Sequence, residues 1–177
     1  MRKLRLSKIP INSTMDEEAE ADKALQYALR FLGYRGRSVQ EMRRKLASRG
    51  VSEAATAQVL QRLLQLELLN DRDFAQSWIE SRRGYGAVRL RKELQQKGIS
   101  RELVEAIMTT GISADEEYQA AWLVAVRSLR GATESPGPEL LIKIRRLLLR
   151  RGFRYETINR VCARLNDSSS VEEDWQE

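Results

Sequence analysis

Apolar residues recur along this chain with the spacing of helices. The first clear stripe follows the i, i+3, i+4, i+7 pattern that puts side chains on one helix face, and consists of Leu25, Ala28, Leu29 and Leu32. Glycines, serines and prolines interrupt the pattern and divide the chain into nine predicted helices. Only residues 4–6 alternate weakly, in the manner of a short strand. We therefore predict an all-α fold.

Three glycines, Gly50, Gly98 and Gly152, mark an internal repeat. Apolar residues stand eight and four positions before each glycine and one and nine positions after it: Met42, Leu46, Val51 and Val59; Leu90, Leu94, Ile99 and Ile107; Ile144, Leu148, Phe153 and Val161. The glycines are 48 and 54 residues apart, which fits three-helix units with variable loops. Each glycine is expected to end a helix in the left-handed conformation. Units of this size are expected to stack end to end.

Polar residues at the predicted helix starts support this division. Ser38, Ser52 and Ser100 have the side chain of an N-cap, and Gly86 takes the place of Ser38 in the next repeat. Pro138 fits the first turn of a helix. We predict a flexible basic arm at residues 1–15, repeats at 16–69, 70–112 and 113–165, and a disordered acidic tail at 166–177.

Charge is distributed unevenly around a net value of +6. Residues 16–20 hold four acids and no base, and residues 166–177 hold five acids and no base, so residues 21–165 carry about +11. Basic pairs recur seven and six positions before the three glycines: Arg43 and Arg44, Arg91 and Lys92, Arg145 and Arg146. Arg89 and Lys143 add to the last two pairs. A hydrophobic core does not require these bases, which are either a solvated helix face or a surface for a phosphate backbone.

Several function classes have little support in the sequence. The chain has no histidine, which excludes His-based triads and His-ligated metal sites. Asp71 and Asp73 could be imagined as a metal-binding pair, but they stand at a predicted helix start, where acids cap backbone N–H groups. Cys162, the single cysteine, excludes an internal disulfide and fits a buried position in a cytoplasmic protein. No apolar run approaches the length needed to span a bilayer, and a secretory signal is not expected.

Three stretches carry more specific motifs: residues 37–46, residues 69–75 and, above all, residues 81–100. The last combines the glycine-flanked Tyr85 with a basic helix that ends in Lys97, Gly98 and Ile99. These stretches resemble the RecX family, the regulatory proteins of the RecA recombinase. The resemblance covers residues 20–165 and implies three tandem three-helix, helix-turn-helix-like repeats in an elongated, curved body without catalytic activity. The N-terminal arm and the acidic tail depart from the family pattern.

The resemblance also implies a function. The family binds RecA filaments and DNA, and it restrains filament growth, strand exchange, ATP hydrolysis and coprotease function of RecA in DNA repair and the SOS response. We therefore expect a cytoplasmic monomer that binds RecA filaments and single- and double-stranded DNA, needs no cofactor or metal and contacts no membrane. The expected DNA- and RecA-binding residues are Arg43, Arg44, Tyr85, Arg89, Arg91, Lys92, Lys143, Arg145 and Arg146.

Some alternatives stay open at this point. Tyr85 stacks on a base or docks on protein if its loop exposes it, but it packs against its own repeat if the helix junction encloses it. A helix-turn-helix transcription regulator without RecA contact is the main alternative function. Its recognition helix would need Arg, Asn or Gln near its start, whereas the third helices begin Glu53-Ala54-Ala55 and Glu102-Leu103-Val104. A protein-binding scaffold without DNA contact is a third possibility.

Overall fold

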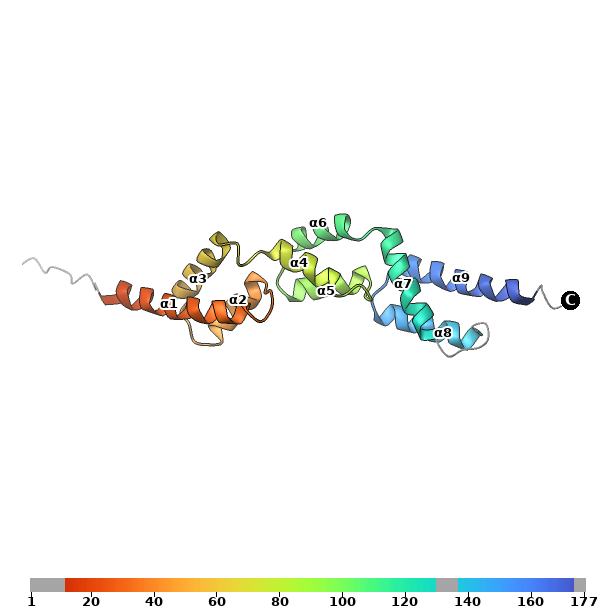
Figure 1. The fold of residues 1–177 in the computed structure, drawn as a ribbon, viewed down its shortest axis with the longest axis horizontal. Coiled ribbons are helices and arrows are strands. Elements are labelled where there is room, and N and C mark those ends of the chain that lie inside the picture. Colours follow the sequence, from red (N-terminus) through yellow and green to blue (C-terminus); the bar gives the residue numbers. More distant parts are fainter. Residues whose placement is uncertain (1–11, 130–136, 174–177) are drawn as a thin grey trace, which may run out of the picture. The chain divides into compact units, whose positions relative to one another are not determined.

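The computed structural model describes residues 12–129 and 137–173, which contain nine α-helices and no strand (Figure 1). Their bounds are α1 Asn12–Leu32, α2 Val39–Ala47, α3 Glu53–Gln65, α4 Asp71–Glu80, α5 Ala87–Gln96, α6 Arg101–Gly111, α7 Ala114–Leu129, α8 Pro138–Arg150 and α9 Tyr155–Glu173. The helices form two compact units, one ending at Asp71 and the other beginning at Arg72. The all-α class predicted from the sequence is confirmed, with a three-helix repeat as its building block.

The apolar columns of the repeat form the core of each three-helix group. The residues eight and four positions before the glycines are all at most 1% exposed: Met42, Leu46, Leu90, Leu94, Ile144 and Leu148. The residues nine positions after the glycines are buried as well: Val59, Ile107 and Val161. Three separate core clusters result, one for each repeat. The sequence pattern therefore identified the residues that hold each repeat together.

The three aligned glycines adopt the predicted left-handed conformation. Their φ angles are +76° at Gly50, +85° at Gly98 and +76° at Gly152. In this conformation the residue after each glycine donates its N–H back to the buried leucine of the preceding helix, as Ile99 does to the Leu94 carbonyl at 3.1 Å. The chain is thereby reversed sharply between the second and third helices of each repeat.

The predicted serine caps are present. The side chain of Ser38 accepts a hydrogen bond from the Glu41 N–H at 3.0 Å, and Ser52 and Ser100 cap α3 and α6 in the same way. Gly86 occupies the N-cap position of α5, and Pro138 is in the first turn of α8. These caps begin the helices at the positions that the sequence indicated.

Both ends of the described chain differ from the prediction. Helix α1 begins at Asn12, so the predicted arm at 1–15 overlaps a helix, and residues 1–11 lie outside the described part. Helix α9 continues to Glu173, although the tail from residue 166 was predicted to be disordered. No glycine or proline lies between residues 153 and 177, so nothing in the local sequence stops the helix. Leu29, placed in the apolar stripe, is 37% exposed, and Ala24 is buried instead.

Within the second unit, the second and third repeats meet through backbone contacts at Gly86. The Gly86 N–H donates to the Arg151 carbonyl at 2.9 Å, and the Val88 N–H donates to the Gly152 carbonyl at 3.1 Å. A β-carbon on Gly86 would lie 2.2 Å from the Gly152 oxygen. Gly86 is therefore required for a close approach of two chain segments, rather than for an unusual φ angle.

A buried acid completes this junction. Glu117, in the first turn of α7, is 2% exposed, and its carboxylate accepts the Ala87 N–H at 3.0 Å. The same carboxylate accepts the Arg154 N–H at 3.3 Å and the Thr157 hydroxyl at 3.4 Å, and it pairs with the Arg154 guanidinium at 2.9 Å. Gly86 has no side chain with which to cap α5, and Glu117 of the next repeat supplies that acceptor.

Candidate nucleic-acid interface

The basic pairs of the repeat lie on the second helix of each three-helix group, next to its buried column. The residues six positions before the glycines, Arg44, Lys92 and Arg146, are all exposed. Lys92 and Arg146 have no carboxylate within ion-pair distance in the described part of the chain. An exposed base therefore occupies the same helix position in three repeats, and Lys92 and Arg146 can contact a phosphate without first breaking an ion pair.

The residues seven positions before the glycines are less uniform than predicted. Arg43 is exposed, but Arg91 and Arg145 are only partly exposed. The Arg91 Nε lies 3.1 Å from Glu105, and the Arg145 guanidinium lies 5.8 Å from the ring centre of Tyr155. Each arginine lies on the second helix of its repeat and contacts a residue of the third helix, which follows after the short glycine turn. The prediction that all six bases are exposed is therefore wrong for these two.

Tyr85 is also less accessible than its glycine-flanked loop indicated. Its ring packs against the core of the second repeat, and the Arg89 guanidinium lies over it at 4.2 Å. Arg151 of the third repeat approaches the same ring at 5.6 Å and donates to the Gly84 carbonyl at 3.1 Å. Of the two alternatives left open for Tyr85, the structure favours packing against its own repeat, with the ring partly buried at the junction with the third repeat.

A single carboxylate organises the bases around this motif. Glu93 accepts hydrogen bonds from Arg89 Nε at 2.8 Å and from Trp78 Nε1 at 3.1 Å, and it pairs with Arg82 at 3.2 Å. Burial alone would raise the pKa of Glu93, but the hydrogen bonds from Arg89 and Trp78 outweigh it and hold that pKa below its ordinary value. Arg82 also stacks on Trp78 at 3.4 Å. Arg89 and Arg82 are thus fixed in place rather than free to follow a ligand.

A shallow groove of about 390 Å³ joins bases from the second and third repeats. Arg89, Lys92 and the acid Glu93 line it from α5, and Arg150 and Gly152 line it from the end of α8. Arg89 reaches across it towards the Arg150 carbonyl, at 3.5 Å. The groove contains Arg89 and Lys92, two of the expected binding residues, and it adds Arg150, which the sequence analysis did not identify. Lys143 is exposed on α8 but does not line the groove.

Cations stacked on aromatic rings recur in the repeats, and the sequence analysis missed them. The residue just before each glycine is basic and lies over a ring: Arg49 over Tyr27 at 4.3 Å, Lys97 over Trp78 at 4.7 Å and Arg151 over Tyr85 at 5.6 Å. In the third repeat, Arg160 and Arg164 of α9 cover Tyr118 and Trp122 of α7. The sequence signal was present as a third basic column, at the position before the glycines.

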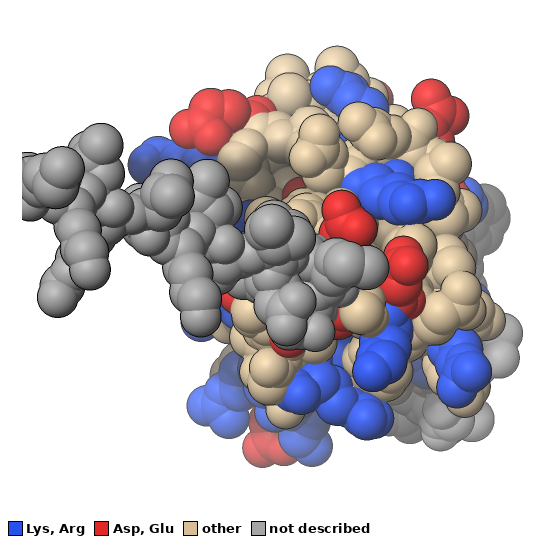
Figure 2. Space-filling view, turned by 90° about the vertical axis from the view of Figure 1, so that its left-hand side faces the viewer, with Lys and Arg blue, Asp and Glu red and all other residues tan. Residues whose placement is uncertain are grey.

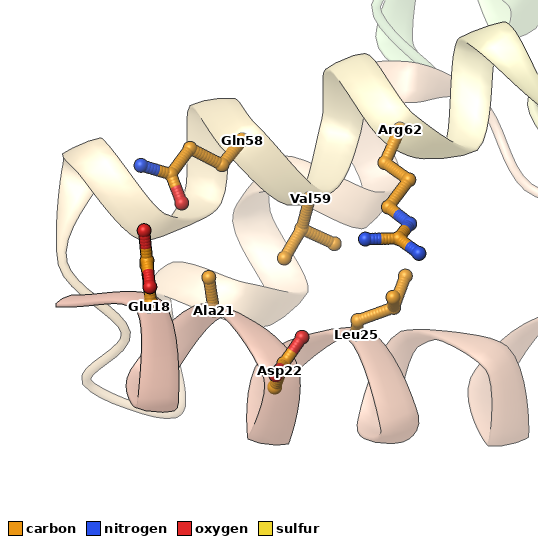
Figure 3. Close-up of a pocket in the computed structure, with 7 residues that line it drawn as sticks. All are labelled: Glu18, Ala21, Asp22, Leu25, Gln58, Val59 and Arg62. Atoms are coloured by element: carbon orange, nitrogen blue, oxygen red, sulfur yellow. The ribbon is translucent and has the colours of Figure 1, made fainter. Parts of the chain in front are cut away.

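One further cleft, between α1 and α3, has a different character. Glu18, Ala21, Asp22 and Leu25 line it from α1, and Gln58, Val59 and Arg62 line it from α3 (Figure 3). Its volume is about 320 Å³. The cleft contains two carboxylates, Glu18 and Asp22, and one guanidinium, Arg62. Its net negative charge would repel a phosphate backbone, so this cleft is not part of a nucleic-acid surface.

Surface charge elsewhere is mixed. Lys and Arg side chains are exposed together with Asp and Glu on the face shown in Figure 2. Asp71, considered above with Asp73, lies instead at a helix start, where its carboxylate accepts the Val39 N–H at 2.9 Å. Burial raises the pKa of Asp71 despite that hydrogen bond. The described residues include no cluster of acidic or cysteine side chains suited to a metal ion, and none of their helices is long and apolar enough to cross a membrane.

Comparison with known families accounts for the three-helix groups. Models of the first, second and third three-helix domains of RecX match residues 24–63, 70–108 and 115–162 in turn. The chain belongs to the RecX family. The resemblance noted in the sequence is thereby confirmed, and the RecX match extends over most of the chain.

Individual RecX relatives agree with this assignment. The chain is 32% identical over 166 residues to the regulatory protein RecX of Halalkalibacterium halodurans, covering 90% of this chain and 60% of that protein. It is 35% identical over 151 residues to the regulatory protein RecX of Prosthecochloris aestuarii, covering 84% of this chain and 97% of that protein. The crystal structure of RecX from Lactobacillus salivarius matches with a TM-score of 0.74 at 22% identity, over 84% of this chain and 98% of that one. The last likeness supports the fold alone.

Proposed function

We propose that this RecX-family chain binds DNA and RecA filaments and lowers the recombinase, ATPase and coprotease activities of RecA in DNA repair and the SOS response. It acts by binding rather than by catalysis. The observation that carries the DNA-binding part is the exposed base six positions before the glycine in every repeat: Arg44, Lys92 and Arg146. Membership of a family of regulatory proteins supports the RecA part.

The physical basis of DNA binding would be the release of counterions from the phosphate backbone. Each phosphate that a base neutralises contributes a salt-dependent free energy that is independent of sequence. The groove gathers Lys92 and Arg150 from two repeats beside Arg89, whose charge is already paired with Glu93. Lys92 and Arg150 are therefore the strongest candidates for such a contact in the second unit. Arg91 and Arg145 would contribute mainly to the packing of their own repeats rather than to DNA binding, because they already contact Glu105 and Tyr155.

The test compares two double variants with the same change of charge. Lys92→Gln with Arg146→Gln removes two bases of the repeated column, while Arg101→Gln with Arg127→Gln removes two exposed bases of the same repeats outside it. The first variant should weaken binding to all DNA sequences alike and reduce the slope of log affinity against log salt by about two. Its inhibition of the DNA-dependent ATPase of RecA should fall in parallel.

Three results would contradict the proposal. Equal losses in both variants would mean that bulk charge governs DNA binding. Unchanged inhibition of RecA despite weakened DNA binding would mean that RecA is contacted at a surface other than the repeated basic column. No effect of the unmodified protein on the RecA ATPase, with DNA binding intact, would favour a transcription regulator or another DNA-binding role without RecA contact.

A further inference from the structure

We infer that the first repeat carries a binding surface for single-stranded nucleic acid, in which Tyr34 stacks on a base and the ring-stacked cations Arg37, Lys45 and Arg49 hold the phosphates. This single-strand surface rests on the proposed DNA binding and adds to it the strand type and the place of contact. The sequence analysis selected Tyr85 as the aromatic of the interface, whereas the structure exposes Tyr34.

Tyr34 is the most accessible large aromatic side chain of the described residues. It lies between α1 and α2 and is 84% exposed, compared with 61% for Tyr155. A solvent-exposed aromatic ring does not gain the stabilising free energy that a buried ring contributes to a core. A ring in this position offers a flat face to a nucleic-acid base, and such stacking tolerates any sequence because every base has a π-face.

Three cations near this loop are held on aromatic rings of α1. The guanidinium of Arg37 lies 3.9 Å from the ring centre of Phe31, and the amine of Lys45 lies 5.4 Å from the same ring. Arg49 covers Tyr27 at 4.3 Å. Tyr27 and Phe31 are themselves nearly parallel, with an interplanar angle of 9°. One layer of rings therefore positions three charges along the side of α2.

The stacked cations are available to an anion. None of the three has a carboxylate within ion-pair distance in the part of the chain that the structure describes, unlike Arg35, which pairs with Glu41 at 3.1 Å. Stacking occupies the face of a guanidinium and leaves its N–H edge for phosphate oxygens. The buried Nε of Arg37 has no hydrogen-bond partner. Burial, and then the charge of Arg35, lowers the pKa of Arg37, although the charge of Glu41 acts in the opposite direction.

The exposed ring and Arg37 are close enough to act on one strand. Tyr34 is three residues from Arg37, which limits their backbone separation to about 11 Å even in a fully extended chain. Bases in a duplex are stacked on their neighbours, and extracting one costs several kcal/mol. Since an unpaired strand offers its bases without that cost, the combination of one exposed ring with fixed cations favours single strands over duplexes.

The first test replaces Tyr34 by leucine, which keeps an apolar side chain but removes the ring. Affinity of the full chain for a thymidine oligonucleotide, measured by fluorescence anisotropy, should fall about tenfold, because stacking on one base is lost; this is about 1.4 kcal/mol. Duplex affinity and the slope against salt should stay the same, and Tyr34→Trp should restore binding. Tyr155→Leu in the third repeat is the control and should have a smaller effect.

The second test removes one charge at a time within the first unit. Arg49→Gln should lower the salt slope for the single strand by about 0.7. Arg62→Gln removes an exposed base of α3 that lines the acidic cleft, and it should leave the slope unchanged. A thymidine oligonucleotide with one 5-iodouracil should form a photo-crosslink to Tyr34.

Several outcomes would overturn the inference. Equal losses for single strands and duplexes with Tyr34→Leu would mean that the ring does not read unpaired bases. Unchanged single-strand affinity together with weaker RecA inhibition would assign Tyr34 to a protein contact. If the Tyr34 and Arg49 variants bind DNA like the parent while the Lys92 and Arg146 double variant binds DNA more weakly, the proposed function stands without this single-strand surface. If the unmodified chain binds no DNA at low salt, both fall.

Discussion

Replacing Glu117 by glutamine should destabilise the second unit strongly, although the two side chains have nearly the same shape. The Glu117 carboxylate accepts hydrogen bonds from the Ala87 N–H, the Arg154 N–H and the Thr157 hydroxyl, and it pairs with the Arg154 guanidinium. An amide has only one acceptor oxygen, and its NH₂ group would face donors. At least one buried donor would lose its partner in the variant.

The magnitude follows from these contacts. A buried donor without a partner costs about 1–3 kcal/mol, and a hydrogen bond to a charged group is worth about 1.5–3 kcal/mol. The Arg154 contribution is reduced because that side chain is 35% exposed and water can reach it. We expect a loss of about 2–4 kcal/mol in the free energy of unfolding. For a unit of about 100 residues this corresponds to a fall in melting temperature of roughly 10–20 °C.

Tryptophan fluorescence provides a selective assay. The three tryptophans, Trp78, Trp122 and Trp175, all follow Asp71, so thermal unfolding monitored in this way reports the second unit. Glu116→Gln is the matched control because this exposed neighbour bonds only to Ser113 among the described contacts, and its melting temperature should stay close to that of the parent. A melting temperature of the Glu117 variant within about 1 °C of the parent would refute the role assigned to this carboxylate.

Two further changes test the glycines and the motif network. Gly86→Ala should destabilise the second unit by about 3 kcal/mol, because its β-carbon would overlap the Gly152 carbonyl, and an unchanged melting temperature of that unit would contradict the close approach. Gly50→Ala should cost the first unit only about 1 kcal/mol, because only its φ of +76° is strained. Glu93 has a folded-state pKa below its ordinary value of 4.5, so its stabilising contribution is full above that value and is lost as the pH falls through the folded-state pKa. Glu93→Gln should therefore flatten the decline of melting temperature below about pH 4.5, and an unchanged decline would mean that other carboxylates cause it.

The repeat and its core could be read from the sequence because both depend on local rules. A helix brings positions four apart onto one face, so the columns eight and four positions before Gly50, Gly98 and Gly152 had to face the same core. The left-handed glycines and the serine caps depend on neighbouring residues only. For the same reason, the basic column at Arg44, Lys92 and Arg146 could be identified as a candidate surface from its spacing alone.

The contacts between helices and between repeats were decided by the tertiary structure. In the sequence, Glu117 is an acid on the apolar face of α7. Only the tertiary structure shows that its carboxylate accepts the N–H of Ala87 and so caps α5, thirty residues earlier in the chain. Arg91 and Arg145 share their sequence pattern with exposed positions, yet each contacts a residue of another helix. The ring of Tyr85 is approached by Arg151 of the third repeat. Periodicity specifies the face of a helix on which a residue lies, whereas the exposure of that residue depends on which neighbour packs against that face.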